Sequence, residues 1–123
     1  MPFVTVSGLP DNLSPDFLID MRRQIIQAVV REMEVEISWV RVFFPVDMLA
    51  QPQKLEDGCQ TVYVTLETAM FHNHEDAELK KIALATVNAI AHVIWEYLQG
   101  KCEVEVFVLH LSPDLKKVLP ATK

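Results

Sequence analysis

The sequence predicts an α+β fold, a two-layer α/β sandwich in which two tandem β-α-β units form a four-stranded mixed sheet with two helices on one face. One observation behind this is a repeated order of strand, helix and strand along the chain. Another is that residues 40–43, Val-Arg-Val-Phe, resemble residues 104–107, Val-Glu-Val-Phe. Because a helical crossover makes the two strands that it joins parallel, each unit supplies one parallel pair.

The first unit begins with a strand over Phe3–Val6, followed by a polar turn and a long helix. Ser14 is placed to cap that helix, Pro15 suits its first position, and Asp16 adds an acid to its first turn. Apolar residues then recur at helical spacing, so one helix face is expected to be buried. The unit ends in a strand expected over Trp39–Phe44.

The second unit repeats this order. A strand is expected over Thr61–Leu66, and a helix with regularly spaced apolar residues runs from about Glu75 to Gln99. Gly100 is placed to end this helix. The last strand is expected over Glu103–Leu109.

The strand parities predict how the sheet is covered. One side is uniformly apolar and is expected to carry the helices. The other side is mixed, and its members are Phe3, Thr5, Trp39, Arg41, Phe43, Tyr63, Glu105, Phe107 and Leu109. A two-layer domain with so much apolar surface on its free face should be covered by another subunit, so the sequence predicts a homo-oligomer.

Composition limits the classes of partner and compartment. The chain has 123 residues, half of them hydrophobic, and a net charge of −6 without a basic run. This predicts a globular domain and argues against nucleic acid or a membrane surface as a partner. Neither a spanning apolar stretch nor a signal-peptide pattern is present, which favours a cytoplasmic location. There, Cys59 and Cys102 could remain free thiols.

Pro2 is the most informative residue for function. If Met1 is removed, as a small second residue generally permits, the N-terminus becomes a secondary amine on a rigid ring. Burial disfavours the protonated form of such an amine, so its pKa falls and it can act as a base near pH 7. Proline at position two is not rare, however, and Pro2 taken alone is more readily interpreted as structural.

These features together resemble the tautomerase superfamily, over the whole chain. The resemblance rests on Pro2, the two tandem units and the run Trp-Val-Arg-Val at residues 39–42. The group includes 4-oxalocrotonate tautomerase, 5-carboxymethyl-2-hydroxymuconate isomerase and macrophage migration inhibitory factor, and extends to a bacterial branch. It implies a single tautomerase-like domain over residues 1–123, typically trimeric, with pseudo-repeats at about 2–45 and 60–110 and a C-terminal tail at 111–123.

The resemblance also implies a function. In such enzymes, without a cofactor or metal, the N-terminal proline moves a proton on a small 2-oxo or enol carboxylate, and Pro2 matches that role. A strand arginine binds the substrate carboxylate, and Arg41 sits at that place, with a fork of donors that suits a planar anion. Phe3, Phe43 and Phe107 are expected to line the pocket. Because Pro2 and Arg41 have opposite strand parity, the site is expected to form between subunits.

The departures from the family pattern keep alternatives open. Residues 7–10 offer no counterpart to the arginine after the first strand, and residues 34–36 offer none to the lysine after the first helix. A site with one cation counts against dicarboxylate substrates. It also leaves open a non-catalytic trimeric binding protein, or a protonated Pro2 that promotes water addition, dehalogenation or decarboxylation. Arg41 could instead form a structural ion pair with Glu105 or Glu103 on the same sheet face.

The run His-Asn-His-Glu at residues 72–75 invites a metal interpretation, but no third ligand follows at a recognisable spacing. Capping of the second helix by Asn73 or His74, with Glu75 and Asp76 in its first turn, explains the run more simply. No metal site is therefore predicted.

Overall fold

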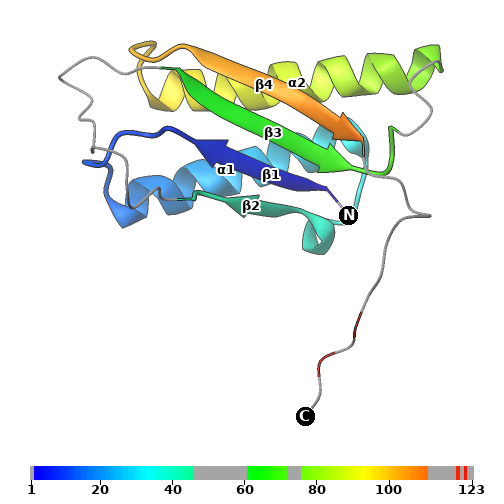
Figure 1. Ribbon diagram of the computed structural model, residues 1–123, viewed down its shortest axis with the longest axis horizontal. Helices are drawn as coiled ribbons and strands as arrows, with labels where there is room; N and C mark the ends of the chain where they lie inside the picture. Colours follow the sequence, from blue (N-terminus) through cyan, green and yellow to red (C-terminus); the bar gives the residue numbers. More distant parts are fainter. Residues whose placement is uncertain (1, 46–60, 72–75, 111–118, 120, 122–123) are drawn as a thin grey trace.

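The computed structural model describes residues 2–45, 61–71, 76–110, 119 and 121. Its strands form one sheet, and its two long helices lie together on one face of that sheet (Figure 1). The elements in chain order are β1 (Phe3–Ser7), α1 (Pro15–Met33), the 3₁₀ turn η1 (Ile37–Trp39), β2 (Arg41–Phe43), β3 (Val62–Thr68), α2 (Ala77–Tyr97) and β4 (Val104–His110). The predicted fold class is confirmed.

The sheet has the strand order β2-β1-β3-β4. β1 and β2 are parallel, as are β3 and β4, so each unit contributes the parallel pair that a helical crossover requires. The two units meet where β1 and β3 run antiparallel in the middle of the sheet. The outer strands, β2 and β4, therefore lie at opposite edges.

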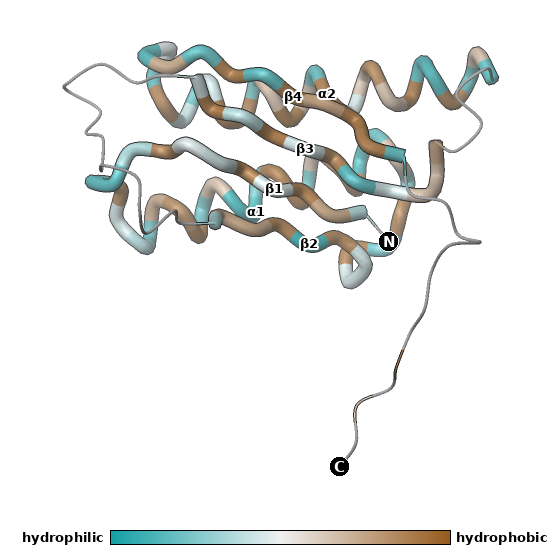
Figure 2. The backbone as a smooth tube through the Cα atoms, viewed as in Figure 1, coloured by the Kyte–Doolittle hydropathy of each residue, from teal (hydrophilic) through white to brown (hydrophobic). Residues whose placement is uncertain are grey.

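The core lies between the sheet and the helices. The predicted apolar parity is confirmed, because the inward side chains of β1 and β3 are fully buried under the helices. The largest contributors to this core with no exposed surface are Val4, Met21, Ile25, Val29, Val62, Val64, Leu66, Ile90, Ile94 and Leu98. Hydrophobic residues also run along most of β4 (Figure 2). Burial of this apolar surface is the main force that holds the two layers together.

The second strand is shorter than the sequence predicts. Trp39 was expected to open it, but Trp39 ends η1, whose backbone bonds run from Trp39 N to the Glu36 oxygen and from Val40 N to the Ile37 oxygen. β2 pairs only with β1, and its first residue, Arg41, pairs with Phe3, where β1 begins. Trp39 therefore lies beyond the end of its neighbouring strand, and the backbone makes local turn bonds instead.

The helix ends follow the predicted chemistry, with one correction. Ser14 caps α1, and its side chain accepts a bond from Phe17 N. The second helix begins at Ala77, two residues after the expected start at about Glu75. Its cap is Asp76, which accepts bonds from the backbone of Glu78 and Leu79, so the expectation that Asn73 or His74 caps this helix, with Asp76 in its first turn, is wrong. A carboxylate on two backbone N–H groups at a helix N-terminus is favourable in both geometry and charge. The run at residues 72–75 lies outside the described residues.

The end of α2 bears out the prediction for Gly100. The backbone at Gly100 has φ +69°, a left-handed conformation that glycine adopts without a Cβ penalty. Its N–H donates to the Trp95 carbonyl, which satisfies one of the last carbonyl groups of the helix.

The expectation that the cysteines are free thiols is corrected at Cys102. Cys102 is buried and disulfide-bonded, so the expectation of a free thiol there is wrong, while Cys59 lies outside the described residues. Among the helices that the structure describes, none is both long and apolar enough to cross a membrane.

Candidate functional site

The site begins where the start of β1 meets the start of β2. Arg41 N donates to the Pro2 carbonyl oxygen at 3.1 Å, and the register places Arg41 directly beside Phe3. Pro2 is buried on the helix side, whereas the side chain of Arg41 is exposed. The two backbones therefore meet within one chain, although their side chains leave the strands in opposite directions.

Main-chain carbonyl groups hold the Arg41 side chain. Its Nη1 donates to the carbonyl oxygen of Ser38, at 2.5 Å, and to that of Val40, at 3.1 Å. Both carbonyls belong to the turn that replaces the expected start of β2. An arginine has five N–H donors in a planar fork, and these two bonds use only the Nη1 donors. In the described part of the chain, the Nε and Nη2 edge of Arg41 has no hydrogen-bond partner.

The expected alternative for Arg41, an ion pair with Glu105 or Glu103 of the same chain, is wrong. β2 and β4 are at opposite edges of the sheet, with β1 and β3 between them. The ion pairs within the described residues are Arg23–Asp20 and Arg31–Glu32, both on α1. Arg41 is thus an exposed cation without a carboxylate partner among those residues.

Two of the three predicted pocket phenylalanines lie together beside Arg41. The rings of Phe3 and Phe43 stack with centroids 6.3 Å apart and an angle of 27° between their planes. Phe107 is separated from them, because Phe43 pairs with Thr5 of β1 and Phe107 pairs with Thr65 of β3. One strand, β3, therefore lies between the phenylalanine pair on β1 and β2 and Phe107 on β4.

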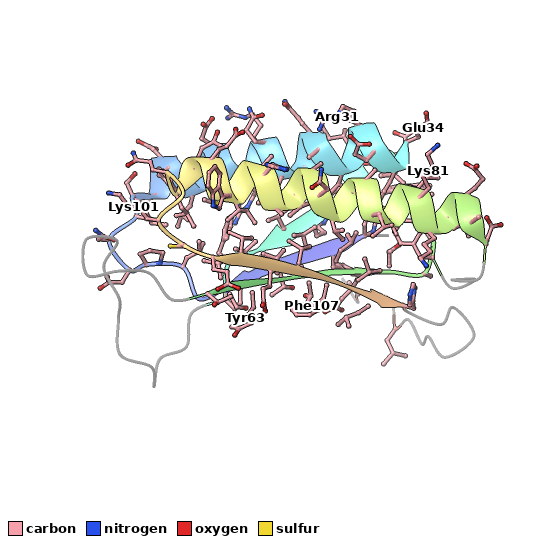
Figure 3. The ribbon with its side chains drawn as sticks, turned by 90° about the horizontal axis from the view of Figure 1, so that it is seen from above. Arg31, Glu34, Tyr63, Lys81, Lys101 and Phe107 are labelled. Carbon is pink, nitrogen blue, oxygen red and sulfur yellow. The ribbon has the colours of Figure 1, made fainter. Side chains whose placement is uncertain are left out.

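Phe107 lies on the open side of the sheet, the side away from the helices. Its side chain and that of Tyr63 project from this open face (Figure 3). Phe43, Tyr63 and Phe107 are each about half exposed, at 49%, 52% and 49%. The open face thus carries apolar surface both beside Arg41, at Phe43, and farther from it, at Tyr63 and Phe107.

Two contributors to the site escaped the sequence reasoning. The Ser38 carbonyl could not be inferred, because any residue carries one and only the turn aims it at Arg41. Glu67 was missed because the third strand was expected to stop at Leu66. In the structure β3 continues to Thr68, and Glu67 pairs with Phe3. The alternation of Tyr63, Thr65 and Glu67 was the available signal.

The groove that the structure forms elsewhere is unrelated to these residues. It is shallow and open, lies between α2 and β4, and is lined by Leu84, Ala85, Val87, Asn88, Ala91 and Val106. The described residues also contain no group of three or more His, Cys, Asp or Glu side chains that could hold a metal ion.

Comparison with known proteins identifies the fold. No family model and no curated protein matches the sequence. Among solved structures, a fused 4-OT symmetric trimer has a TM-score of 0.67 at 16% identity, covering 94% of this chain and 90% of that one. Pt0534 inactivated by 2-oxo-3-pentynoate has a TM-score of 0.65, with the same identity and coverage. A macrophage migration inhibitory factor-like protein from Entamoeba histolytica has a TM-score of 0.62 at 6% identity, covering 95% of this chain and 94% of that one. This chain therefore has the fold of these structures, which is the fold that the sequence resemblance implied.

Proposed function

We propose that the protein is a cofactor-free tautomerase or isomerase of small 2-oxo or enol carboxylates, with Pro2 as the base once Met1 has been removed. The observation that carries the proposal is the position of Arg41, an exposed cation whose backbone N–H donates a hydrogen bond to the Pro2 carbonyl oxygen. Its Nε and Nη2 edge matches the two oxygens of a carboxylate. Because the Pro2 and Arg41 side chains of one chain leave in opposite directions, a substrate bound to Arg41 would have its reactive carbon next to the N-terminal amine of a neighbouring copy.

The proposed chemistry is a balanced proton transfer. The neutral Pro2 amine takes a proton from a carbon next to the substrate carbonyl, and the C–H bonding electrons move into an enolate. The resulting ammonium returns the proton at another carbon, so a double bond moves and nothing is oxidised. Burial supports this role, because an amine shielded from water is more readily neutral near pH 7. Phe3, Phe43 and Phe107 are proposed to exclude water from the pocket.

The proposed working form is a homotrimer of single 123-residue domains. The exposed phenylalanine, tyrosine and leucine side chains of the open face support burial between copies. The fused 4-OT structure described as a symmetric trimer supports the number three. Because Phe107 is far from Phe43 within one chain, the third pocket phenylalanine would come from a neighbouring copy.

The nature of the proposed substrate has separate support. Pt0534, which shares the fold, is inactivated by 2-oxo-3-pentynoate, a small 2-oxo acid. The proposal transfers that chemical class to this chain, without its specific substrate.

Ketonisation of the enol form of phenylpyruvate by Met1-free protein tests the proposal. Pro2→Ala should lower kcat/KM by about 10²–10⁴-fold, the usual contribution of a positioned general base. Pro15→Ala, at the exposed first position of α1, is the matched control and should leave the rate unchanged. Mass spectrometry of each variant establishes that Met1 is absent. Equal activity of the Pro2→Ala and Pro15→Ala variants would reject the mechanism.

A non-catalytic trimeric binding protein is the second candidate. It is favoured by the scarcity of cations, because Arg41 is the only Lys or Arg among the described strand residues of the open face. Under this alternative Met1-free protein still binds small carboxylates at Arg41 but turns none of them over.

A further inference from the structure

Phe3 is flanked by two opposite charges on the open face. The parallel register pairs Phe3 with Arg41 on one side, and the antiparallel register pairs it with Glu67 on the other. All three residues have the outward strand parity. Adjacent strands are about 4.8 Å apart, so the backbones of Arg41 and Glu67 are about 10 Å apart across Phe3.

Glu67 is partly exposed and could contact a ligand, as Arg41 could. It is only half-buried, and in the described ranges it has neither an ion pair nor a side-chain hydrogen bond. Since Arg41 is held by the carbonyls of Ser38 and Val40, the two charges do not neutralise each other across Phe3. The surface next to Pro2 is therefore a short apolar strip with a cation at one end and an anion at the other.

This arrangement carries an inference about specificity that rests on the proposed function. We propose that Glu67 determines the substrate class: the site takes a monocarboxylate whose far end is uncharged, donates hydrogen bonds or is cationic, and it rejects dicarboxylates. A ligand with its carboxylate on Arg41 and its chain over Phe3 brings its far end to Glu67. A second carboxylate there meets a like charge without a second cation to offset it.

The length of the ligand follows from the same spacing. A chain of about six carbons covers most of the distance of about 10 Å between Arg41 and Glu67. Shorter acids bind Arg41 without reaching Glu67, so discrimination against a second carboxylate should appear only when the chain is long enough.

Binding of a matched pair of acids tests this inference. The probes are 2-oxohexanoate and 2-oxohexanedioate, which differ in the far-end carboxylate, and the measurement is isothermal titration calorimetry on Met1-free protein. The wild type should bind the monocarboxylate about tenfold more tightly, and Glu67→Gln should remove most of that preference. Glu105→Gln is the control, because it removes the same charge from β4. Glu105 pairs with Tyr63 and not with Glu67, so it lies away from the proposed site.

Several outcomes would overturn the inference. They are equal binding of the two acids by wild type, a preference that survives in Glu67→Gln, the same loss in Glu105→Gln, and failure of the monocarboxylate to bind. The assay does not depend on turnover, so it separates this inference from the role of Pro2. If Pro2→Ala keeps full activity while Glu67→Gln loses selectivity, the base is wrong and the specificity residue stands. If catalysis depends on Pro2 but the preference survives in Glu67→Gln, only the specificity assignment fails.

Discussion

The two β-α-β units have the same topology but differ in their outer strands. β2 has three residues and follows a 3₁₀ turn, whereas β4 has seven residues and pairs with β3 along its whole length. Within the matching runs at residues 40–43 and 104–107, Arg41 in the first unit corresponds to Glu105 in the second. Both side chains have the outward parity at an edge of the sheet.

This difference shows how one repeated framework can confine its chemistry to one half. In a long edge strand, the backbone N–H and C=O groups on one side form regular hydrogen bonds with the neighbouring strand. The late start of β2 leaves the carbonyls of Ser38 and Val40 in the turn that precedes it, where they hold the Arg41 guanidinium. β4 pairs along its whole length, so it leaves no such turn beside Glu105. The shortness of β2 thus creates a positioned cation beside Pro2.

The largest effect expected from this comparison of the two units is that of replacing Arg41 by alanine, with the corresponding replacement of Glu105 beside it. Arg41→Ala should lower kcat/KM for phenylpyruvate by about a hundredfold, equivalent to about 2.7 kcal/mol of transition-state stabilisation, because a charge-assisted bidentate contact is lost. Glu105→Ala should change it less than about twofold, because β4 lies at the far edge. Similar losses in the two variants would contradict the asymmetry between the units.

Much of this fold follows from local sequence rules, while the site depends on pairings that those rules do not contain. Ser14 and Pro15 mark the start of α1, and the alternating valines identify the inward side of the sheet, because caps and parity are properties of short segments. The strand order, which separates Arg41 from Glu105, is a long-range choice. The same holds for the turn at Trp39, which depends on where β1 begins.

The ends of the two helices offer a second, smaller test of the comparison. α1 is followed by its C-cap Glu34, with φ 54°, and α2 is followed by Gly100, with φ +69°. Gly100→Ala should lower the free energy of unfolding by about 1–2 kcal/mol, because a left-handed residue would gain a Cβ. That Cβ would lie 2.9 Å from Trp95 Cζ2. Urea denaturation measures the change.

Glu34→Ala is the matched variant for this test. Glu34 already has a Cβ in the left-handed conformation, so its replacement by alanine should change stability by less than about 0.5 kcal/mol. A larger loss at Glu34 than at Gly100 would mean that side-chain contacts, and not backbone conformation, dominate at these positions.

The smallest expected effect concerns the contact that joins the two units on their helix side. The Tyr97 hydroxyl of α2 donates to Asp20 of α1 at 2.5 Å, and the Tyr97 ring meets Phe17 edge-on, with centroids 5.5 Å apart. The hydrogen bond to the Asp20 carboxylate raises the pKa of Tyr97, with smaller contributions from burial and from the charge of Asp20. Because the contact is mostly exposed, Tyr97→Phe should cost only about 0.5 kcal/mol near neutral pH.

The pH dependence of this cost follows from the direction of the shift. A tyrosine whose folded-state pKa is raised favours folding while it is protonated, so its contribution is complete below the unfolded value of about 10 and is lost as pH rises through the folded value. The stability difference between wild type and Tyr97→Phe, measured in urea, should be constant from about pH 6 to 9 and shrink above about pH 10. Tyr63→Phe is the control, because Tyr63 is 52% exposed and has no hydroxyl partner among the described residues. If Tyr97→Phe and Tyr63→Phe behave alike across this range, the bond to Asp20 does not tie the two units together, and their association rests on the apolar core and the β1–β3 pairing alone.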